Sequence, residues 1–136
     1  MVPQQTLYLG DLRCRTNHGP SGVELVSDAP ADNQGKGQSF SPTDLVVTAL
    51  ATCIVTTAGI LARREEVALE GTRVFSEKHM SAEGPRRILK IILRFEMPRG
   101  IPIAFRPKFD VVVRTCPVRL SLNPEITIGV TVNYPD

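Results

Sequence analysis

A chain of 136 residues is long enough to bury one compact core, and we expect a single domain over residues 1–136. Hydrophobic residues make up 42% and charged residues 22% of the chain, both near the average for soluble globular proteins. The net charge of +2 is too small to favour nucleic acid or an anionic membrane as a partner.

The first residues lack the basic and apolar segments of a signal peptide, so the sequence predicts a cytoplasmic protein. Its three cysteines, Cys14, Cys53 and Cys116, then lie in a reducing compartment, where a disulfide is transient and functional rather than a structural link. No Cys-x-x-Cys pair occurs, which excludes a thioredoxin-type motif and a zinc ribbon.

The N-terminal part predicts two short strands, at residues 6–12 and 23–27, which form a hairpin around residues 17–22. A polar loop with several glycines follows at residues 28–40. It contains Gly35-Lys36-Gly37 without the spacing of a phosphate-binding loop, so we expect a mobile loop and no nucleotide site.

A long helix is predicted from Pro42 to about Glu65, because Ser41 suits the N-cap, proline suits the first position and Asp44 suits the acid of a capping box. Residues 45–62 carry no charge, so a membrane span is the alternative to a buried central helix. We expect a helix buried on most sides, with a partner subunit covering one of them. The predicted apolar stripe comprises Val46, Ala49, Leu50, Cys53, Thr57, Ile60 and Leu61.

Three further strands are expected, at residues 72–80, 89–97 and 126–134, with a turn at residues 81–85 between the first two. Residues 104–115 fit a strand by propensity and a helix by the spacing of their apolar residues, so the pattern leaves both open. Cys116 is predicted to cap a short helix that begins at Pro117 and ends near Leu122.

Two thiols that meet in the fold could form a redox pair. A thiolate that attacks a hydroperoxide becomes a sulfenic acid, and a second thiol then condenses with it to a disulfide. Cys116 is the thiol we expect to ionise more easily, because it lies at a helix start. The alternatives are that Cys53 is an ordinary core residue and that Cys116 is an ordinary cap.

Other site types have weaker support in the sequence. The cysteines and the two histidines, His18 and His79, lack the spacing of a metal site, and nothing places a histidine beside a cysteine as a Cys-His hydrolase requires. We expect both histidines to be solvated and Cys14 to have no role. Neither a metal nor another cofactor is expected.

Three segments together resemble the OsmC/Ohr family of osmotically induced and organic-hydroperoxide-resistance proteins. They are Ser41-Pro42-Thr43-Asp44-Leu45, Ala49-Leu50-Ala51-Thr52-Cys53, and Thr115-Cys116-Pro117-Val118 with the following Ser121-Leu122 and Pro124. Pro85-Arg86-Arg87-Ile88 is similar to the OsmC-like branch of the family.

The resemblance implies an α+β fold with an antiparallel sheet, a long buried central helix and a second helix at residues 104–115, assembled as an intertwined homodimer. It also implies an antioxidant stress-response activity, in which organic hydroperoxides are reduced and a dithiol reductant restores the enzyme. By position, Cys53 would be the peroxidatic thiol and Cys116 the resolving thiol, with Arg13 or Arg15 as the arginine that stabilises the thiolate.

One position departs from the peroxidase members of the family. They carry a glutamate directly after the helix-start proline, where this chain has Thr43. Asp44 follows, but it points about 100° away around the helix. Two hypotheses therefore stand: a cytoplasmic thiol peroxidase acting through Cys53 and Cys116, or a non-enzymatic dimer of the same fold that binds a small apolar ligand or senses redox state.

Overall fold

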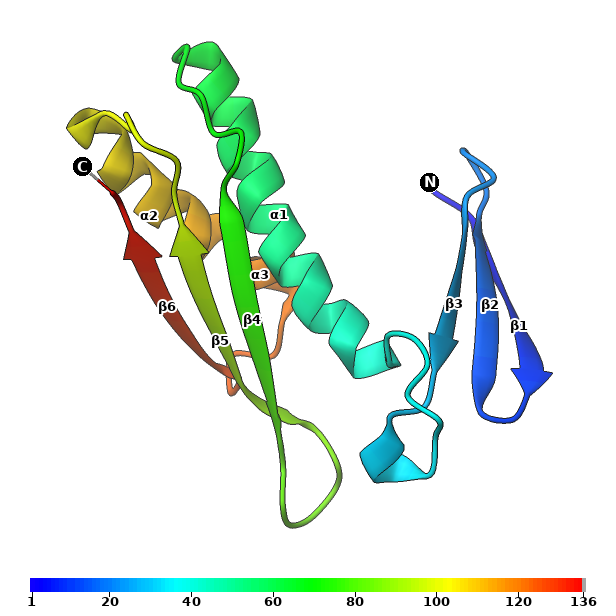
Figure 1. Cartoon of the computed structure of the whole chain (residues 1–136). Coiled ribbons are helices and arrows are strands. Elements are labelled where there is room, and N and C mark those ends of the chain that lie inside the picture. Colours follow the sequence, from blue (N-terminus) through cyan, green and yellow to red (C-terminus); the bar gives the residue numbers. More distant parts are fainter. Residues whose placement is uncertain (136) are drawn as a thin grey trace. The chain divides into compact units, whose positions relative to one another are not determined.

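A computed structural model describes residues 1–135 of the chain (Figure 1). The chain divides into two compact units, Met1–Val46 and the remainder from Val47, and we describe each by itself. Together they contain two three-stranded sheets and three α-helices among the described residues, which makes an α+β protein as predicted.

The first unit is an antiparallel sheet in the order β1-β2-β3, formed by Gln4–Gly10, Arg13–His18 and Glu24–Asp28 (Figure 1). The prediction of two strands here was wrong, because β2 lies between them and β1 ends before Leu12. A sequence of alternating basic and polar residues has no apolar signature, so β2 is recognised only through its pairing with both neighbours. The hairpin turn at residues 17–22 is confirmed, since it joins β2 to β3.

The loop after β3 folds back on itself rather than standing open. A short 3₁₀ helix, η1, covers Ala31–Asn33, and the amides of Gly35 and Gly37 donate to the carbonyls of Pro30 and Ala29. No side chain fits at Gly35, because a Cβ atom there would overlap the Ala29 carbonyl. The loop is thus organised by its own backbone hydrogen bonds.

Helix α1 spans Pro42–Arg64, and its predicted start is confirmed. The Asp44 amide donates to Ser41 Oγ over 3.1 Å, while the Ser41 amide donates to Asp44 Oδ2 over 2.9 Å. These reciprocal bonds are those of a capping box, and they satisfy two backbone donors that the helix itself leaves open.

The buried face of α1 differs from the predicted stripe, and in the single chain the helix is buried along one side only. Only Leu50 of the predicted stripe is buried, and Ile60 is 54% exposed. A helix that is apolar all round offers no unambiguous face to periodicity, so packing chose a stripe displaced by one residue. By length and composition alone, α1 could also cross a membrane. The residues buried along α1 are Val47, Leu50, Ala51, Ile54, Ala58 and Ala62.

The second unit holds a sheet in the order β4-β5-β6, formed by Arg73–Met80, Ile88–Glu96 and Thr127–Asn133. Strands β4 and β5 are antiparallel, but β5 and β6 are parallel, so the sheet is mixed rather than antiparallel as expected. The parallel pairing arises because α2 and α3, which lie between β5 and β6 in the chain, return β6 in the same direction.

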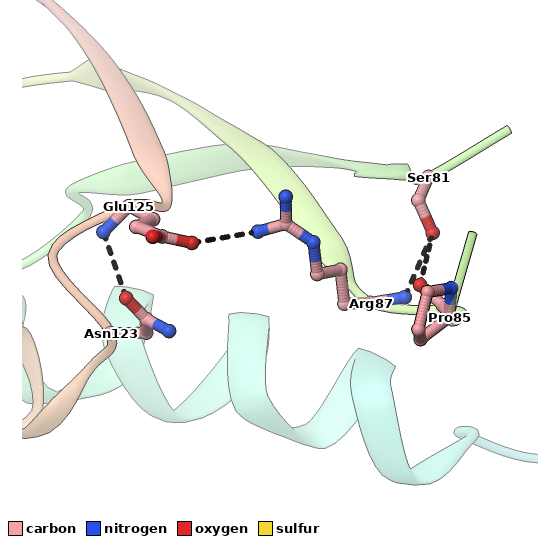
Figure 2. Close-up of polar contacts among 5 residues, drawn as sticks. All are labelled: Ser81, Pro85, Arg87, Asn123 and Glu125. Atoms are coloured by element: carbon pink, nitrogen blue, oxygen red, sulfur yellow. Dashed lines mark hydrogen bonds and ion pairs between the residues drawn. The ribbon is translucent and has the colours of Figure 1, made fainter. Parts of the chain in front are cut away.

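Polar contacts join the β4–β5 turn to the start of β6 (Figure 2). Ser81 Oγ donates to the Pro85 carbonyl and accepts from the Arg87 amide, which closes the turn. The Arg87 guanidinium reaches Glu125 at 3.2 Å, and the Glu125 amide donates to Asn123 Oδ1. The turn predicted at residues 81–85 is confirmed.

Residues 104–115 are helical, which resolves the ambiguity between strand and helix. A 3₁₀ turn, η2, covers Ile103–Phe105; α2 covers Arg106–Thr115 and α3 covers Pro117–Ser121. Phe109 of α2 meets Phe95 of β5 edge to face, with ring centroids 5.2 Å apart. Both rings are 99% or more buried, so they help to fix α2 against the sheet. Figure 1 shows α2 beside this sheet.

Candidate functional site

The candidate site is a pair of thiols in the second unit. Cys53 lies in the middle of α1 and is half-buried, whereas Cys116 is the residue between α2 and α3 and is fully buried. The two side chains are near enough for Cys53 to affect the pKa of Cys116, although the residues lie far apart in sequence. Both thiols are reduced, and Cys53 Sγ also lies 3.9 Å from Thr57 Oγ1 on the next turn of α1.

The fold holds Cys116 through the ends of two helices. Its amide donates to the Val112 carbonyl and closes α2. Its backbone is then extended, and its sulfur accepts a hydrogen bond from the Arg119 amide over 3.4 Å, which opens α3. The prediction of Cys116 as the cap of a short helix is therefore confirmed.

The expectation that Cys116 ionises more easily was wrong. Burial is the largest effect and raises the pKa of Cys116 above its ordinary value of 9.0, and the hydrogen bond and negative charge of Cys53 raise it further. The amides of Arg119 and Val118 act in the opposite direction and lower the pKa without prevailing. A five-residue helix adds only a short row of peptide dipoles, so desolvation wins.

The two candidate arginines lie on β2 in the first unit and have different partners. Arg13 Nε is 4.0 Å from Asp28 Oδ2, and the Asp28 side chain is fully buried. Arg15 Nε is 3.9 Å from Glu24 Oε1, and both of those side chains are about half exposed. The sequence did not point to Asp28, because a single acid at the end of a strand carries no motif.

The histidines and the third cysteine give no second site. His18 Nδ1 lies 2.6 Å from Ser21 Oγ inside the β2–β3 turn, and His79 Nε2 lies 3.3 Å from an exposed Glu77. Cys14 is a free thiol on β2 that is half-buried. Within residues 1–135, no cluster of three or more histidine, cysteine or acidic side chains could hold a metal ion.

A cleft of about 540 Å³ in the second unit is lined by residues of α2, α3 and β6 and by Tyr134. Arg119, whose amide donates to Cys116, is one of its lining residues. Tyr134 is another, and its buried hydroxyl has no hydrogen-bond partner among residues 1–135. Burial and the nearby Asp110 raise the pKa of Tyr134, while Arg106 lowers it. No sequence motif predicted this cleft. Its apolar lining residues are Val113, Ile128, Val130 and Val132.

Comparison with known proteins gives a consistent result. The family model described as OsmC-like protein matches residues 35–131. A structure from Psychrobacter arcticus 273-4, named for osmotic stress induction and a detoxification response, is 38% identical at a TM-score of 0.92, over 98% of this chain and 96% of that one. No curated protein matches the sequence.

More distant structures share the fold. An OsmC-like protein from Mycoplasma pneumoniae is 18% identical, with a TM-score of 0.81 over 98% of this chain and 96% of its own. An organic hydroperoxide resistance protein OsmC from Legionella pneumophila is 16% identical, with a TM-score of 0.75 over 97% and 96%. At these identities the likeness concerns the fold alone.

Proposed function

Because this chain belongs to the OsmC-like protein family, we propose that it is a thiol-dependent peroxidase that reduces organic hydroperoxides. The observation that carries the proposal is the nearness of Cys53 to Cys116, because such a reaction requires two thiols that can meet. The names of the related organic hydroperoxide resistance proteins from Legionella pneumophila and Elizabethkingia anophelis agree with this chemistry.

The proposed reaction has three steps. The Cys53 thiolate attacks the terminal oxygen of a hydroperoxide, the O–O bond breaks, and the organic part leaves as an alcohol after taking up a proton. The resulting Cys53 sulfenic acid condenses with the Cys116 thiol to give a disulfide and water. A dithiol reductant then reduces this disulfide by exchange and is itself oxidised to a disulfide.

The surroundings of Cys116 support the role of resolving thiol. Burial raises the pKa of Cys116 and the neighbouring Cys53 raises it further, which suits a thiol that stays protonated until it attacks the sulfenic acid. Cys53 is also the more exposed of the two thiols and hence the easier for a peroxide to reach. Arg13 or Arg15 is the proposed cation that stabilises the Cys53 thiolate and the leaving oxygen.

We further propose that the working form is a homodimer. Among the apolar side chains, Leu7, Tyr8 and Leu25 of the first sheet and Ile60 of α1 are each at least 45% exposed in the single chain. Apolar surface of this extent is typical of an interface, and a second copy of the chain would cover it. Sedimentation equilibrium tests this, and a monomer at micromolar concentration would contradict it. The reducing cytoplasm remains the proposed compartment.

One experiment tests the peroxidase. Reduced protein is mixed with cumene hydroperoxide or hydrogen peroxide while peroxide loss and peptide masses are followed. We expect faster reaction with the organic peroxide, a Cys53–Cys116 disulfide, and turnover in the presence of a dithiol. Cys53→Ser should abolish consumption and Cys14→Ser, the matched control, should leave it unchanged. Consumption by Cys53→Ser at the wild-type rate would refute the proposal.

A second function rests on the cleft lined by Arg119 and Tyr134. Its volume and apolar lining residues suit a small apolar ligand, and such a ligand could be bound without any redox chemistry. The absence of the family glutamate at Thr43 favours this non-enzymatic dimer. The same experiment separates the two, because slow oxidation that does not distinguish the peroxides, together with ligand binding retained in Cys53→Ser, would favour the binding protein.

A further inference from the structure

The cleft lined by α2, α3 and β6 holds a positive charge that the described chain leaves unpaired. Arg119 lines this cleft and is half-buried, and its Nη1 atom is buried without a hydrogen-bond partner. The backbone amide of Arg119 is bonded to the Cys116 sulfur, but its guanidinium has no hydrogen-bond or ion-pair partner among residues 1–135. A guanidinium that has lost part of its water without gaining an acceptor is unfavourable, and an anion beside it would offset that cost.

The other charges around the cleft also favour an anion. Two lining residues are arginines, Arg114 and Arg119, and one is an acid, Asp110, so the lining carries one positive charge in excess. Arg106 adds a further guanidinium beside the lining, because its Cζ atom lies 4.5 Å from the ring centroid of Tyr134. A negative ligand is therefore attracted to the cleft and a positive one is repelled.

The remaining surface of the cleft is mainly apolar. Ile128, Val130 and Val132 alternate along β6, so their side chains lie on one face of the strand. Strand β6 is at the edge of its sheet, and all three residues are only half-buried. A hydrocarbon group that covered them would remove apolar surface from water, which is favourable.

Tyr134 adds a second hydrogen-bond donor among the lining residues. Its hydroxyl is buried and has no partner within the described part of the chain. Burial and the nearby Asp110 raise the pKa of Tyr134, so the hydroxyl keeps its proton at neutral pH and can donate it. A carboxylate, which only accepts hydrogen bonds, is the ligand group that matches a guanidinium and a phenol without acceptors.

We propose that this cleft binds a small carboxylate with a hydrocarbon tail, whose charged group pairs with Arg119 while the tail lies along the apolar face of β6. The inference rests on the second proposed function, the binding of a small ligand, and adds the charged group that this ligand carries. A guanidinium suits a carboxylate because it can donate two parallel hydrogen bonds to the two oxygens. A volume of about 540 Å³ is ample for such a ligand.

Two probes with the same chain length test the charged group. Isothermal titration calorimetry measures the dissociation constants of octanoate and 1-octanol with the reduced full chain. We expect octanoate to bind at least about tenfold more tightly, which is the usual effect of a hydrogen bond to a charged group. Octylammonium, which has the opposite charge, should bind more weakly than either.

Variants of Arg119 test the residue. Arg119→Met removes the guanidinium but keeps an unbranched side chain, so it should weaken octanoate binding about tenfold and change octanol binding less than about twofold. The matched control is Arg99→Met, at an exposed arginine outside the lining of the cleft, and it should change neither. If Arg119→Met does not fold by circular dichroism, Arg119→Lys takes its place. Lysine keeps the charge without the two parallel donors and should weaken octanoate binding to a smaller extent.

The tail is tested by its length and by the surface that it covers. From hexanoate to octanoate the affinity should rise by up to about fourfold for each methylene group. Val130→Thr, which places a hydroxyl among the apolar lining residues, should weaken octanoate and octanol alike. An affinity that does not depend on chain length would overturn the placement of the tail.

The outcomes distinguish the inference from the proposed functions. Equal affinities for octanoate and octanol, both weakened by Val130→Thr, would overturn the charged group and leave the second proposed function in place. Octanoate binding that Arg119→Met does not weaken would overturn the inference as well. If none of the probes binds, the inference and the second function both fail. Peroxide turnover is a separate measurement and bears on the peroxidase alone.

Discussion

Two helices of this protein begin in the same way and differ in what their first residues can do. Helix α1 starts at Ser41-Pro42 and α3 starts at Cys116-Pro117, and both cap residues are at least 99% buried. Each cap side chain accepts a hydrogen bond from the amide three residues on, at 3.1 Å for Ser41 and 3.4 Å for Cys116. In both helices an amide of the first turn lacks a partner within the helix, and the cap side chain accepts its hydrogen bond.

The difference lies in the third residue and in the neighbours. Asp44 returns a bond to the Ser41 amide and places a negative charge at the positive end of a long helix. The residue at the same offset in α3 is Arg119, and there the additional partner is Cys53. The environment of a cap residue thus depends on what packs against it, not on the helix start alone.

The largest expected effect comes from making the two caps chemically alike. Cys116→Ser keeps a side chain that can accept the Arg119 amide, so α3 should persist, but no disulfide can form. We expect Cys53 to be oxidised once and to remain a sulfenic acid, with steady turnover lower by at least about an order of magnitude. Trapping with dimedone and mass spectrometry measure this, and wild-type turnover would contradict it.

The next effect concerns alkaline pH. The pKa values of Cys116 and Tyr134 are both raised by burial above their ordinary 9.0 and 10.0, so the folded protein keeps protons that the unfolded chain loses. This stabilisation is complete below pH 9 and is lost as the pH rises through the folded-state values. We expect the free energy of unfolding to fall by up to about 1.4 kcal/mol per pH unit for each group.

Urea unfolding across the alkaline range measures that slope. Cys116→Ser should flatten it and Tyr134→Phe should flatten its more alkaline part. A slope in Cys116→Ser equal to that of wild type would mean that the Cys116 thiol is not the buried group described here.

Removing the other cap should be a matter of stability alone. Ser41→Ala leaves the Asp44 amide without its acceptor and should cost about 1 kcal/mol of the free energy of unfolding. Ser121→Ala, which removes a hydroxyl that donates to a carbonyl on an exposed turn, is the control and should cost less than about 0.5 kcal/mol. If Ser121→Ala lost more free energy of unfolding than Ser41→Ala, the loss in Ser41→Ala could not be assigned to the cap.

The smallest effect is expected at the third residue of α1. Asp44→Asn keeps an oxygen that can accept the Ser41 amide but removes the charge at the helix start, at a cost of about 0.5 kcal/mol. Because salt screens this interaction, the difference between variant and wild type should shrink in 1 M salt, a screening length of about 3 Å. A difference that does not depend on salt would show that the carboxylate acts through its hydrogen bond alone.

Local chemistry predicted much of the fold. Preferences of residues close in sequence determine several features. They are the start and end of α1, the alternation of apolar and polar residues along β5 and β6, and the helix break before Pro117. Strand β2 was missed because its polar residues pair with two neighbours rather than covering a core. The single domain over residues 1–136 stays a prediction.

The site was predicted less completely. The sequence indicated two cysteines of interest, but from the residues alone it assigned the easier ionisation to Cys116, because a helix start is visible in sequence and burial is not. The roles of Cys53, Cys116 and the arginines stay predictions. No pattern distinguished Arg13 from Arg15, since their partners Asp28 and Glu24 are both acids on β3.

By itself the sequence determined where helices begin, which segments alternate between apolar and polar residues, and which cysteines could form a redox pair. Helix caps, prolines and the spacing of apolar residues are all set by residues close together in the chain. Tertiary structure alone decided that β5 and β6 run parallel, which stripe of α1 is buried and that Cys53 meets Cys116. Those outcomes depend on desolvation and on contacts between residues far apart in the chain, and neither quantity can be calculated from a residue and its neighbours.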